Sequence, residues 1–418
     1  AREDHDRELG PTITRELGGE YASGVGPGAL TVLAILRRVT TPISDFRKRE
    51  EPTRTIEVSR SRSRVKTGED IVRATYAMPV VAGQSVELGG EAARNTLDQD
   101  LQAFFDLDRN GTLEPVVMPI SRPHVEEARG EVFLSHKWSV NQRLSLDSSL
   151  NYEFSKLTTN YPLQPTRTLR FLKPRLDLRY KRGEQDQLRF LVERTVSQLD
   201  FANFVPSYNV VDDRIEAGNP GLAPEKTWRF EVGYERRLPD DGGVLEARLF
   251  YDTIKDPIDK APLFTPFLVS ASGNLDSAKR YGAEGKASLR LTALGLRDAV
   301  LSLRALRQHS EVLDPFTGAK RRLKDDRVYA YDISFRHDVL PLRMAYGFTY
   351  KSLGTGVINS DLLVREYYKL EPLLEVFIEK QVRPGAKLRL DVYSITRSPE
   401  TRSRVIYAQN ALHGVPRR

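Results

Sequence analysis

The sequence predicts an all-β fold, an antiparallel transmembrane β-barrel built from consecutive hairpins. Tight-turn residues recur about every fifty residues, and a strand-like segment runs into and out of each turn. Within these segments apolar and polar residues alternate, which gives each strand two distinct faces. Eight turns imply about sixteen strands in the 418 residues. The turns lie near residues 26, 82, 141, 184, 241, 295, 340 and 384.

The alternation is clearest in the segment 342–350, where every even position is apolar and the positions between are small or polar. The segments 144–154 and 228–235 largely repeat this pattern. Each segment has about ten residues, which is enough for a tilted strand to cross the core of a bilayer. We therefore expect one face of each strand to meet lipid and the other to line a lumen.

The connections between the expected strands differ in length on the two sides. Those on one side are short turns, whereas those on the other have roughly ten to twenty-five residues, as in outer-membrane barrels with short periplasmic turns and long extracellular loops. A soluble β-sandwich would show turn signals every 8–12 residues instead. The spacing therefore favours a membrane barrel.

The composition agrees with this prediction. Hydrophobic residues make up 39% of the chain and charged residues 29%, with no cysteine and a net charge of +7. A barrel strand exposes only alternate residues to lipid, so its mean hydropathy stays low. The basic balance raises nucleic acid as a partner, but Lys and Arg are interleaved with Asp and Glu along the strands. This distribution suits a hydrated lumen, and we expect no nucleic-acid partner.

The densest basic stretch is the segment 60–64, in which Arg60, Arg62 and Arg64 alternate with serines. In a strand the three arginines share one face. One interpretation is a solvated strand face that meets outer-membrane lipid and the phosphates of lipopolysaccharide. The alternative is a patch that steers an anionic substrate.

One motif resembles a known family. The segment 219–225 reads N-P-G-L-A-P-E and is followed at once by the alternating strand Trp228–Glu235. It resembles the N-P-x-L-x-P-E signature of TonB-dependent receptors, which precedes a strand in the second half of their barrel. The segments 194–198, 250–256 and 280–284 support the resemblance, because they follow in the order that the family shows.

The resemblance implies that the strands belong to a 22-strand barrel and that a plug domain fills it. Nothing in the chain resembles the plug, so we expect residues 1–418 to be a partial receptor barrel domain without a plug. TonB would then act through a plug that this chain lacks. Ferric siderophore, cobalamin, saccharide and oligopeptide receptors share this barrel, so the resemblance names no solute.

The signature and the loop before it give the candidate site residues. Pro220 and Pro224 fix their own φ and bias the residues before them toward extended conformations, so the signature guides the loop back into a strand. Loops on a rigid scaffold carry recognition, and the same loop offers stacking, hydrogen-bonding and charged groups. The expected structural residues are Asn219, Pro220, Leu222, Pro224 and Glu225. The expected ligand-binding residues, in an extracellular loop, are Phe204, Tyr208, Asn209 and Arg214.

A second loop resembles half of a calcium site. Asp106, Asp108 and Asn110 precede Gly111 as in the first half of an EF-hand loop, but the twelfth position is Val117, where the bidentate glutamate would stand. A polar loop tip is the simpler interpretation, with a calcium-stabilised loop as the alternative. The six histidines show no metal-ligand spacing, and we expect no cofactor.

The sequence therefore predicts an outer-membrane barrel that is not an enzyme, since signatures such as G-x-S-x-G and H-E-x-x-H are absent. By the family resemblance it would take up a scarce small-molecule solute, such as a ferric siderophore or another small nutrient, with energy from TonB. The alternative is a passive porin or a structural barrel without TonB coupling.

Overall fold

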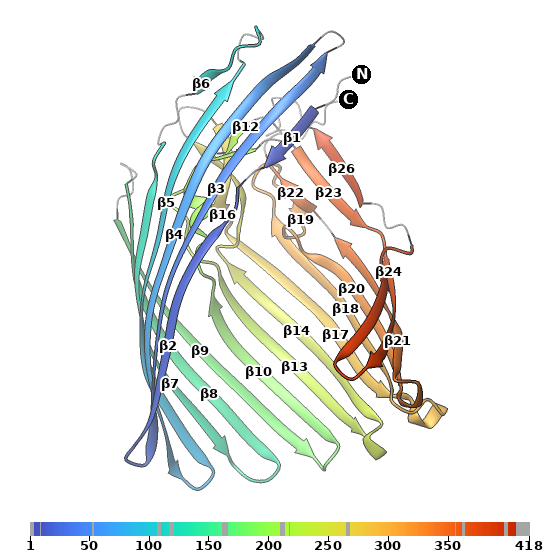
Figure 1. Ribbon diagram of the computed structural model, residues 1–418. Coiled ribbons are helices and arrows are strands. Elements are labelled where there is room, and N and C mark those ends of the chain that lie inside the picture. Colours follow the sequence, from blue (N-terminus) through green and yellow to red (C-terminus); the bar gives the residue numbers. More distant parts are fainter. Residues whose placement is uncertain are drawn as a thin grey trace.

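Sixteen long antiparallel strands form a strongly curved wall in the computed structural model (Figure 1). The structure describes residues 4–8, 10–51, 54–106, 110–116, 121–160, 166–209, 214–216, 218–264, 268–355, 357–361, 364–396 and 400–406. The long strands are β2 (Ile13–Val25), β3 (Gly28–Glu51), β4 (Arg54–Val81), β5 (Gln84–Phe105), β7 (His124–Ser139), β8 (Leu144–Thr159), β9 (Thr166–Arg182), β10 (Asp186–Val196), β13 (Lys226–Leu238), β14 (Gly243–Lys255), β17 (Ser277–Arg290), β18 (Ala299–Leu313), β20 (Arg327–Val339), β21 (Met344–Thr355), β24 (Leu373–Arg383) and β25 (Ala386–Val392).

Most of the shorter elements belong to the connections or turns of the wall, whereas β1 precedes the first long strand and β26 follows the last one. Three short strands join the main sheet, which thereby has 19 strands: β1 (Asp4–Glu8), β6 (Glu114–Val116) and β19 (Lys320–Arg321). Three small sheets contain the pair β11 (Ser207–Asn209) and β12 (Arg214–Glu216), the pair β15 (Ile258–Phe264) and β16 (Leu268–Asn274), and the trio β22 (Val357–Ser360), β23 (Val364–Leu370) and β26 (Glu400–Ile406). The single-turn 3₁₀ helices are η1 (Phe201–Phe204), η2 (Pro239–Asp241), η3 (Leu291–Leu294) and η4 (Leu340–Leu342).

Every long strand pairs antiparallel with the next long strand of the chain, from β2 through to β25. All eight predicted turns join such neighbours, and they lie together at one end of the wall (Figure 1). Gly83 and Gly295 have φ of 75° and 79°, a left-handed conformation that glycine adopts without strain. The predicted all-β hairpin fold is confirmed, including its sixteen long strands. The eight turns define the turn end, and the long connections define the loop end.

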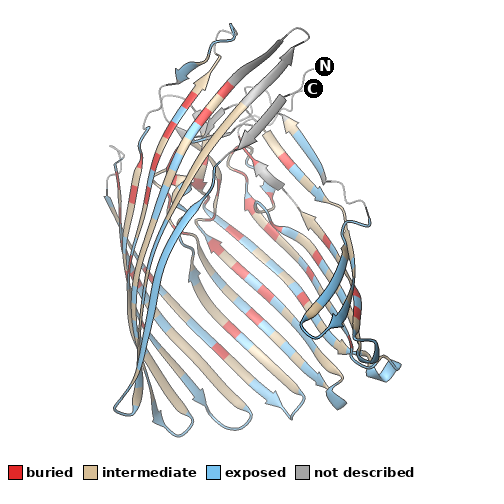
Figure 2. Cartoon of the chain, in the orientation of Figure 1, coloured by how far each residue is buried: buried red, intermediate tan, exposed pale blue. Residues whose placement is uncertain are grey.

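The two faces of the wall follow the alternation in the sequence. On β13 the side chains of Trp228, Phe230 and Val232 are 37–46% exposed, whereas Glu231 between them is only 6% exposed. Large hydrophobic side chains therefore cover the outer face, while charged side chains are packed on the inner face. Figure 2 shows buried positions alternating with exposed ones along the strands. In the described part of the chain, no helix is long and apolar enough to span a membrane.

Candidate functional site: the lumen and its mouth

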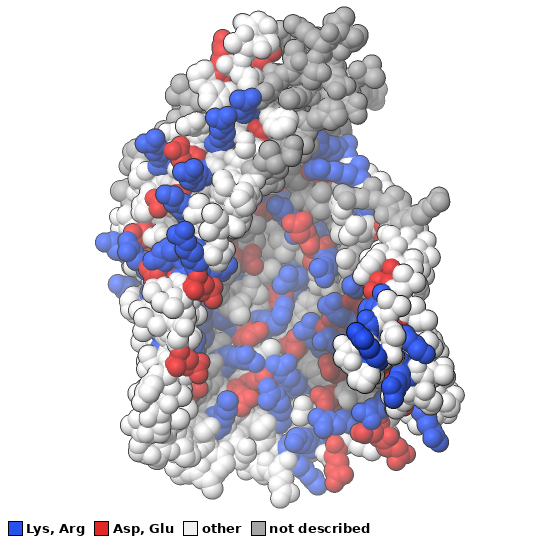
Figure 3. Space-filling view, viewed as in Figure 1, with Lys and Arg blue, Asp and Glu red and all other residues white. Residues whose placement is uncertain are grey.

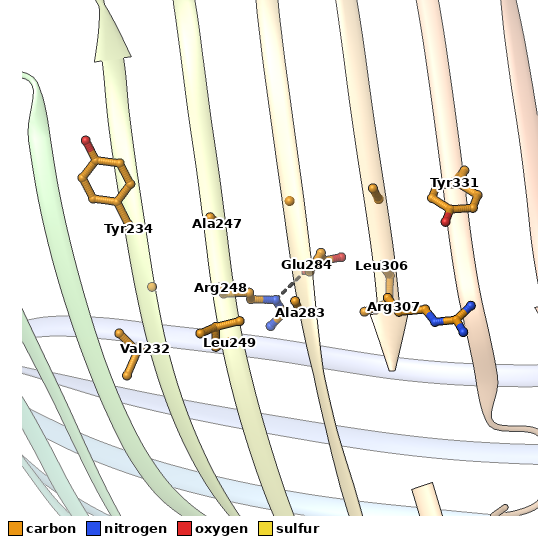
Figure 4. Close-up of a pocket in the computed structure, with 13 residues that line it drawn as sticks. Val232, Tyr234, Ala247, Arg248, Leu249, Ala283, Glu284, Leu306, Arg307 and Tyr331 are labelled. Atoms are coloured by element: carbon orange, nitrogen blue, oxygen red, sulfur yellow. Dashed lines mark hydrogen bonds and ion pairs between the residues drawn. The ribbon is translucent and has the colours of Figure 1, made fainter. Parts of the chain in front are cut away.

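The inner face of the wall carries connected ion pairs. Glu231 on β13 accepts from Arg189 at 3.4 Å and from Arg248 at 3.0 Å. Arg248 also donates to Glu284 on β17 at 2.5 Å, as the dashed line in Figure 4 shows. Glu284 in turn accepts from Arg304 on β18. One chain of charges thus crosses five neighbouring strands, and blue and red side chains line the hollow in Figure 3.

Two aspartates on the inner face are fully buried, and both are surrounded by arginines. Asp177 on β9 accepts hydrogen bonds from Arg189 at 2.7 Å and from Arg175 at 3.0 Å. Asp252 on β14 accepts a bidentate pair from Arg229, at 2.8 and 2.9 Å. Arginine forms such fork-like pairs with carboxylates more readily than lysine does. Because the charges largely compensate one another, the lumen presents a polar surface of mixed sign to whatever occupies it.

The loop between β10 and β13 folds into the lumen at the loop end. Its apolar residues Phe204, Val205 and Leu222 are almost completely buried. They pack with wall residues from β5, β7 and β8 that face the same space, namely Leu97, Val125 and Leu157. Burying such side chains stabilises the packed arrangement by about 1.5–3 kcal/mol each. The loop is therefore held against the wall by its own small hydrophobic core, which we call the mouth core.

The N-P-x-L-x-P-E signature holds this loop in place through its backbone. The side chain of Asn219 accepts from the N–H of Gly221 and donates to the carbonyl of Ser272, both at 2.9 Å. Leu222 occupies the mouth core, and its carbonyl accepts a hydrogen bond from Arg167. Ala223 exchanges hydrogen bonds of 2.8 Å with the side chain of Asn274, at the end of β16. The signature thus joins the β10–β13 loop to the β15–β16 hairpin.

The end of the signature returns the chain to the sheet. Pro224 is buried, and the N–H of Glu225 donates to the hydroxyl of Ser197 at 2.9 Å. The N–H of Ser197 donates back to the carbonyl of Glu225 at 2.9 Å, so the two ends of the loop are tied together just before β13 begins. Burial raises the pKa of the Glu225 carboxyl above its ordinary value, although Arg280 opposes this shift. The contacts of Pro224 and Glu225 thus fix the conformation of the loop where it re-enters the sheet.

A cavity of about 710 Å³ opens beside this loop, between it and β20, β21, β23 and β26. Four cationic side chains and two carboxylates line it: Lys260, Lys324, Arg327 and Arg402, with Asp325 and Glu366. Glu366 is 3% exposed and accepts from Arg402 at 2.8 Å. The side chains of Lys324 and Arg327 form no hydrogen bond or close ion pair with any residue that the structure describes, although Lys324 lies near Asp325. The cavity, called the mouth cavity below, thus has an excess of positive charge and two cations available to a ligand.

The walls of the mouth cavity shift the pKa values of its two carboxyl groups in opposite directions. Burial raises the pKa of Asp325, and nearby Lys324 only partly offsets this effect. Burial would also raise the pKa of Glu366, but hydrogen bonds from Arg402 and Arg404 outweigh it and bring the pKa below its ordinary value. Glu366 therefore stays ionised at neutral pH as a fixed anchor for two arginines.

Next to the mouth cavity, a buried ion-pair cluster joins three connections of the loop end. Asp314, fully buried, accepts from Arg321 at 2.8 Å and from Ser360 at 2.7 Å. Arg321 also donates to Asp259 on β15 at 2.8 Å, and Arg365 on β23 donates to Asp314 at 3.1 Å. Burial of Asp314 would raise its pKa, but the hydrogen bonds from Ser360 and Arg321 outweigh this effect and lower the pKa. We call these five residues the Asp314 cluster.

The predicted ligand-binding residues lie in the β10–β13 loop as expected, and their environments differ. Phe204 is fully buried in the mouth core, where its ring meets Phe201 edge-on at 5.8 Å between centroids. The backbones of Tyr208 and Asn209 belong to β11 and pair with β12, which contains Arg214. The side chains of these last three lie outside the described residues. Phe204 thus serves packing in this structure, and ligand contact by the four residues remains a prediction.

The calcium candidates are only partly described. Asp106 accepts a hydrogen bond from the N–H of Gly111 at 3.1 Å, and Asn110 accepts from the N–H of Thr112 at 2.6 Å. Asp108 lies outside the described residues. Both described side chains act as loop caps within their own segment. Over the described parts of the chain, no group of three or more His, Asp and Glu side chains is arranged to hold a metal ion. Calcium binding by this loop stays a prediction.

The antiparallel hairpin wall, its apolar exterior and its charged interior are those of an outer-membrane β-barrel. The family model "TonB dependent receptor-like, beta-barrel" matches residues 40–366, and the chain belongs to this family. Proteins of this family reside in the bacterial outer membrane, bind solutes and TonB, and are transporters rather than enzymes. The turn end is accordingly periplasmic and the loop end extracellular. The family predicted from the N-P-x-L-x-P-E signature is confirmed.

Solved receptors have the same fold. The chain is similar to the alcaligin receptor FauA from Bordetella pertussis, with a TM-score of 0.55 and 12% identity over 97% of this chain and 70% of that one. It is also similar to the ferric-catecholate import receptor Fiu from E. coli, with a TM-score of 0.60 and 10% identity over 94% of this chain and 60% of that one. For the copper transporter OprC the TM-score is 0.62, with 13% identity over 96% of this chain and 67% of that one.

The chain thus spans 60–70% of the length of these three receptors. At 10–13% identity the likeness shows the fold alone. The three proteins are named for different cargoes, so the fold they share with this chain does not single out a solute. No curated protein sequence matches the chain.

The cations of the mouth cavity are functional candidates that sequence reasoning missed. Lys260 and Lys324 lie in two different connections and Arg402 lies on β26, after the last long strand, so the three are far apart along the chain. No local motif surrounds them, and each looks like an ordinary surface cation in the sequence. Only the pairing of the strands, which brings these connections to one point, places them around a single cavity.

Proposed function

We propose that this protein is an outer-membrane receptor that takes up a scarce solute, such as a ferric siderophore or another small nutrient, with energy supplied through TonB. One observation carries the proposal beyond the family: the mouth cavity, which faces the extracellular end and presents Lys324 and Arg327 without partners among the described residues. A receptor for scarce solutes needs a site that captures them before transport. A cationic cavity suits a solute with anionic groups, such as a chelate with carboxylate or catecholate donors.

The mouth core supports an assignment as a receptor rather than an open pore. Phe204 and Leu222 fix a long loop inside the lumen at the extracellular end. A passive porin keeps a water-filled channel, and a folded loop with its own hydrophobic core would narrow that channel. Energised uptake tolerates such a constriction, because work done by TonB through a plug can open the path.

The test is uptake in bacterial cells that lack their own iron-chelate receptors and express the full-length protein. Radioactive iron is supplied as catecholate, hydroxamate and citrate chelates, in strains with and without TonB. We expect at least one chelate to enter only when TonB is present. Equal entry in both strains would instead favour the passive porin.

The mouth cavity is tested separately by a variant that combines Lys324→Gln and Arg327→Gln. Because each cation contributes about 0.7 kcal/mol to attraction of an anionic group at a partly exposed site, we expect the loss of both to raise the KM of uptake about tenfold. The matched control is Lys181→Gln with Arg182→Gln, which removes two exposed cations from the periplasmic end. Equal KM values for both variants would exclude the mouth cavity from solute capture.

A further inference from the structure

The outer face of β4 carries a row of three cations toward the extracellular end. Along this strand Ser61 is 2% exposed and Val65 packs against the mouth core inside the lumen, so the odd-numbered residues face inward. Arg62, Arg64 and Lys66 alternate with them and are exposed. They therefore project from the outer face of the barrel, away from the path of any transported solute. The patch formed by these three residues is called the outer basic row.

The side chains of the outer basic row remain available for contacts outside the chain. Among the described residues, none of its three cations has a hydrogen-bond or ion-pair partner. Lower on the same face, by contrast, Arg38 forms a bidentate pair with Asp70 at 2.5 and 2.9 Å. Three adjacent cations on one face that form no ion pair with a described residue can bind an anionic partner from outside the chain.

The acidic residues nearest to the outer basic row are held by other side chains. Asp98 on β5 lies opposite Lys66 in register but bonds to His124 at 2.7 Å. Asp100 lies opposite Arg64 and contacts Arg122 at 3.6 Å. A directly opposite pair on neighbouring strands is close enough to interact, so these two carboxylates lower the local potential. They do not close ion pairs with the row.

The height of the outer basic row above the hydrocarbon layer restricts the identity of the partner. Below the row, the outward residues of β4 are apolar from Val80 up to Val72, both 54% exposed, and Asp70 is the first charged one. With a rise of about 3.3 Å per residue and a tilt of about 40°, Lys66 lies roughly 10 Å and Arg62 roughly 20 Å above Asp70. The left wall in Figure 3 is correspondingly white in its lower part and bears charged side chains above.

The phosphates of the membrane lipid itself, including those of lipid A, lie at the edge of the hydrocarbon layer, below this row. The outer leaflet of the outer membrane consists of lipopolysaccharide, whose core sugars next to the lipid carry phosphate and carboxylate groups above that edge. Alternate residues of a strand are about 6.6 Å apart, so three cations can each reach a separate anionic group of such a chain of sugars. We propose that the outer basic row binds the anionic inner-core sugars of lipopolysaccharide. This inference rests on the location in the outer membrane and not on the proposed transport.

The experiment measures the affinity of the purified chain in detergent for two fluorescent probes, by anisotropy. One probe is lipopolysaccharide with a phosphorylated inner core, and the other is lipid A, which lacks core sugars. The test variant combines Arg62→Gln, Arg64→Gln and Lys66→Gln. Each cation near an anionic surface contributes about a fivefold gain in affinity. We therefore expect the Kd of the test variant for the core-bearing probe to rise about a hundredfold. Its Kd for lipid A should change by less than threefold.

The matched control removes three exposed cations from the periplasmic end, by Arg143→Gln, Lys181→Gln and Arg182→Gln. It has the same change in net charge and should bind both probes as the wild type does. Heat-dependent migration on gels checks that all variants are folded barrels. An unchanged Kd for the core-bearing probe in the test variant overturns the proposal. An equal loss for both probes also overturns it, because the row would then recognise the lipid phosphates and not the core.

Discussion

The inner and outer faces of the same strands show opposite relations between polarity and burial. On the inner face Asp177 and Asp252 are completely buried, and arginines surround both. On the outer face Leu249 is 63% exposed to the surroundings, and Phe230 is 45% exposed. A soluble protein has the opposite arrangement, with apolar side chains buried and charged side chains exposed. In lipid the exposed apolar residues are the solvated ones, so the difference shows that the bilayer acts as the solvent for one face and water for the other.

The largest expected difference comes from truncating one aromatic ring that is buried inside the lumen and one that faces lipid. Phe204→Ala leaves a cavity in the mouth core, and we expect it to cost about 3–5 kcal/mol of the stability of the β10–β13 loop. Phe230→Ala on the lipid face leaves no enclosed cavity and should cost about 1–2 kcal/mol. Limited proteolysis between residues 197 and 225 reports on the loop, and urea unfolding in detergent reports on the wall. Equal protection of the loop in both variants would contradict the packing role of Phe204.

A new charge on each face gives the next largest difference. Val232→Arg places a cation on the apolar band, and we expect a loss of about 2–4 kcal/mol in the free energy of unfolding from lipid bilayers. Gln187→Arg adds the same side chain on the luminal face, opposite Glu235 in register, and should change stability by less than about 0.5 kcal/mol. If the two variants were equally stable, the assignment of the faces would be wrong.

Removal of a buried charge on the inner face should have a smaller effect. Asp252→Asn leaves Arg229 and Arg280 with a weaker acceptor, and we expect a loss of about 1–3 kcal/mol, since both arginines remain partly hydrated. Glu371→Gln removes an exposed pair with Lys369 and should cost less than about 1 kcal/mol. Unfolding by urea at neutral pH measures both. A loss as small as that of the exposed pair would mean that the lumen solvates Asp252 fully.

The smallest expected effect is confined to the extracellular end and depends on pH. The pKa of Asp314 is lower in the folded protein than in the unfolded chain. Its contribution to stability is therefore complete above its ordinary pKa, about 3.9, and is lost as the pH falls through the lower folded value. Hydrogen exchange of residues 314–326, corrected for the intrinsic effect of pH, should stay slow from pH 7 to 5 and accelerate below pH 4. In Asp314→Asn this acid step should disappear, and its persistence would assign the step to another group.

The wall could be predicted from the sequence because its periodicity is local. Segments such as 342–350 show the two faces directly, and Gly83 and Gly295 mark turns that need a left-handed residue. A structural role for the N-P-x-L-x-P-E residues could be predicted because prolines restrict the backbone wherever they stand, and that role stays a prediction. The face shared by Arg62 and Arg64 also followed from alternation. The sequence did not show that this face points outward, because that direction depends on the packing of Val65 toward the lumen.

The mouth could not be predicted in the same way. Phe204 lies in a loop without strand-like alternation, and nothing in that segment identifies Leu97 and Val125, on distant strands, as the residues that pack against it. The Asp314 cluster likewise joins Asp259 and Arg365, more than a hundred residues apart in the sequence. Such contacts depend on how far the wall curves and on where its connections meet. A local pattern of residue types predicts neither property.

The pairing order of the wall has a consequence for its assembly. Each long strand pairs with the next long strand of the chain, so every step of sheet growth closes only one turn or one connection. The entropic cost of closing such a loop rises slowly with its length, so the long extracellular connections add little to it. The wall can therefore grow hairpin by hairpin, with each edge strand as the template for the next. We expect hairpins with the shortest turns to form first, and the mouth to be completed only after β23 has reached β20 and β15.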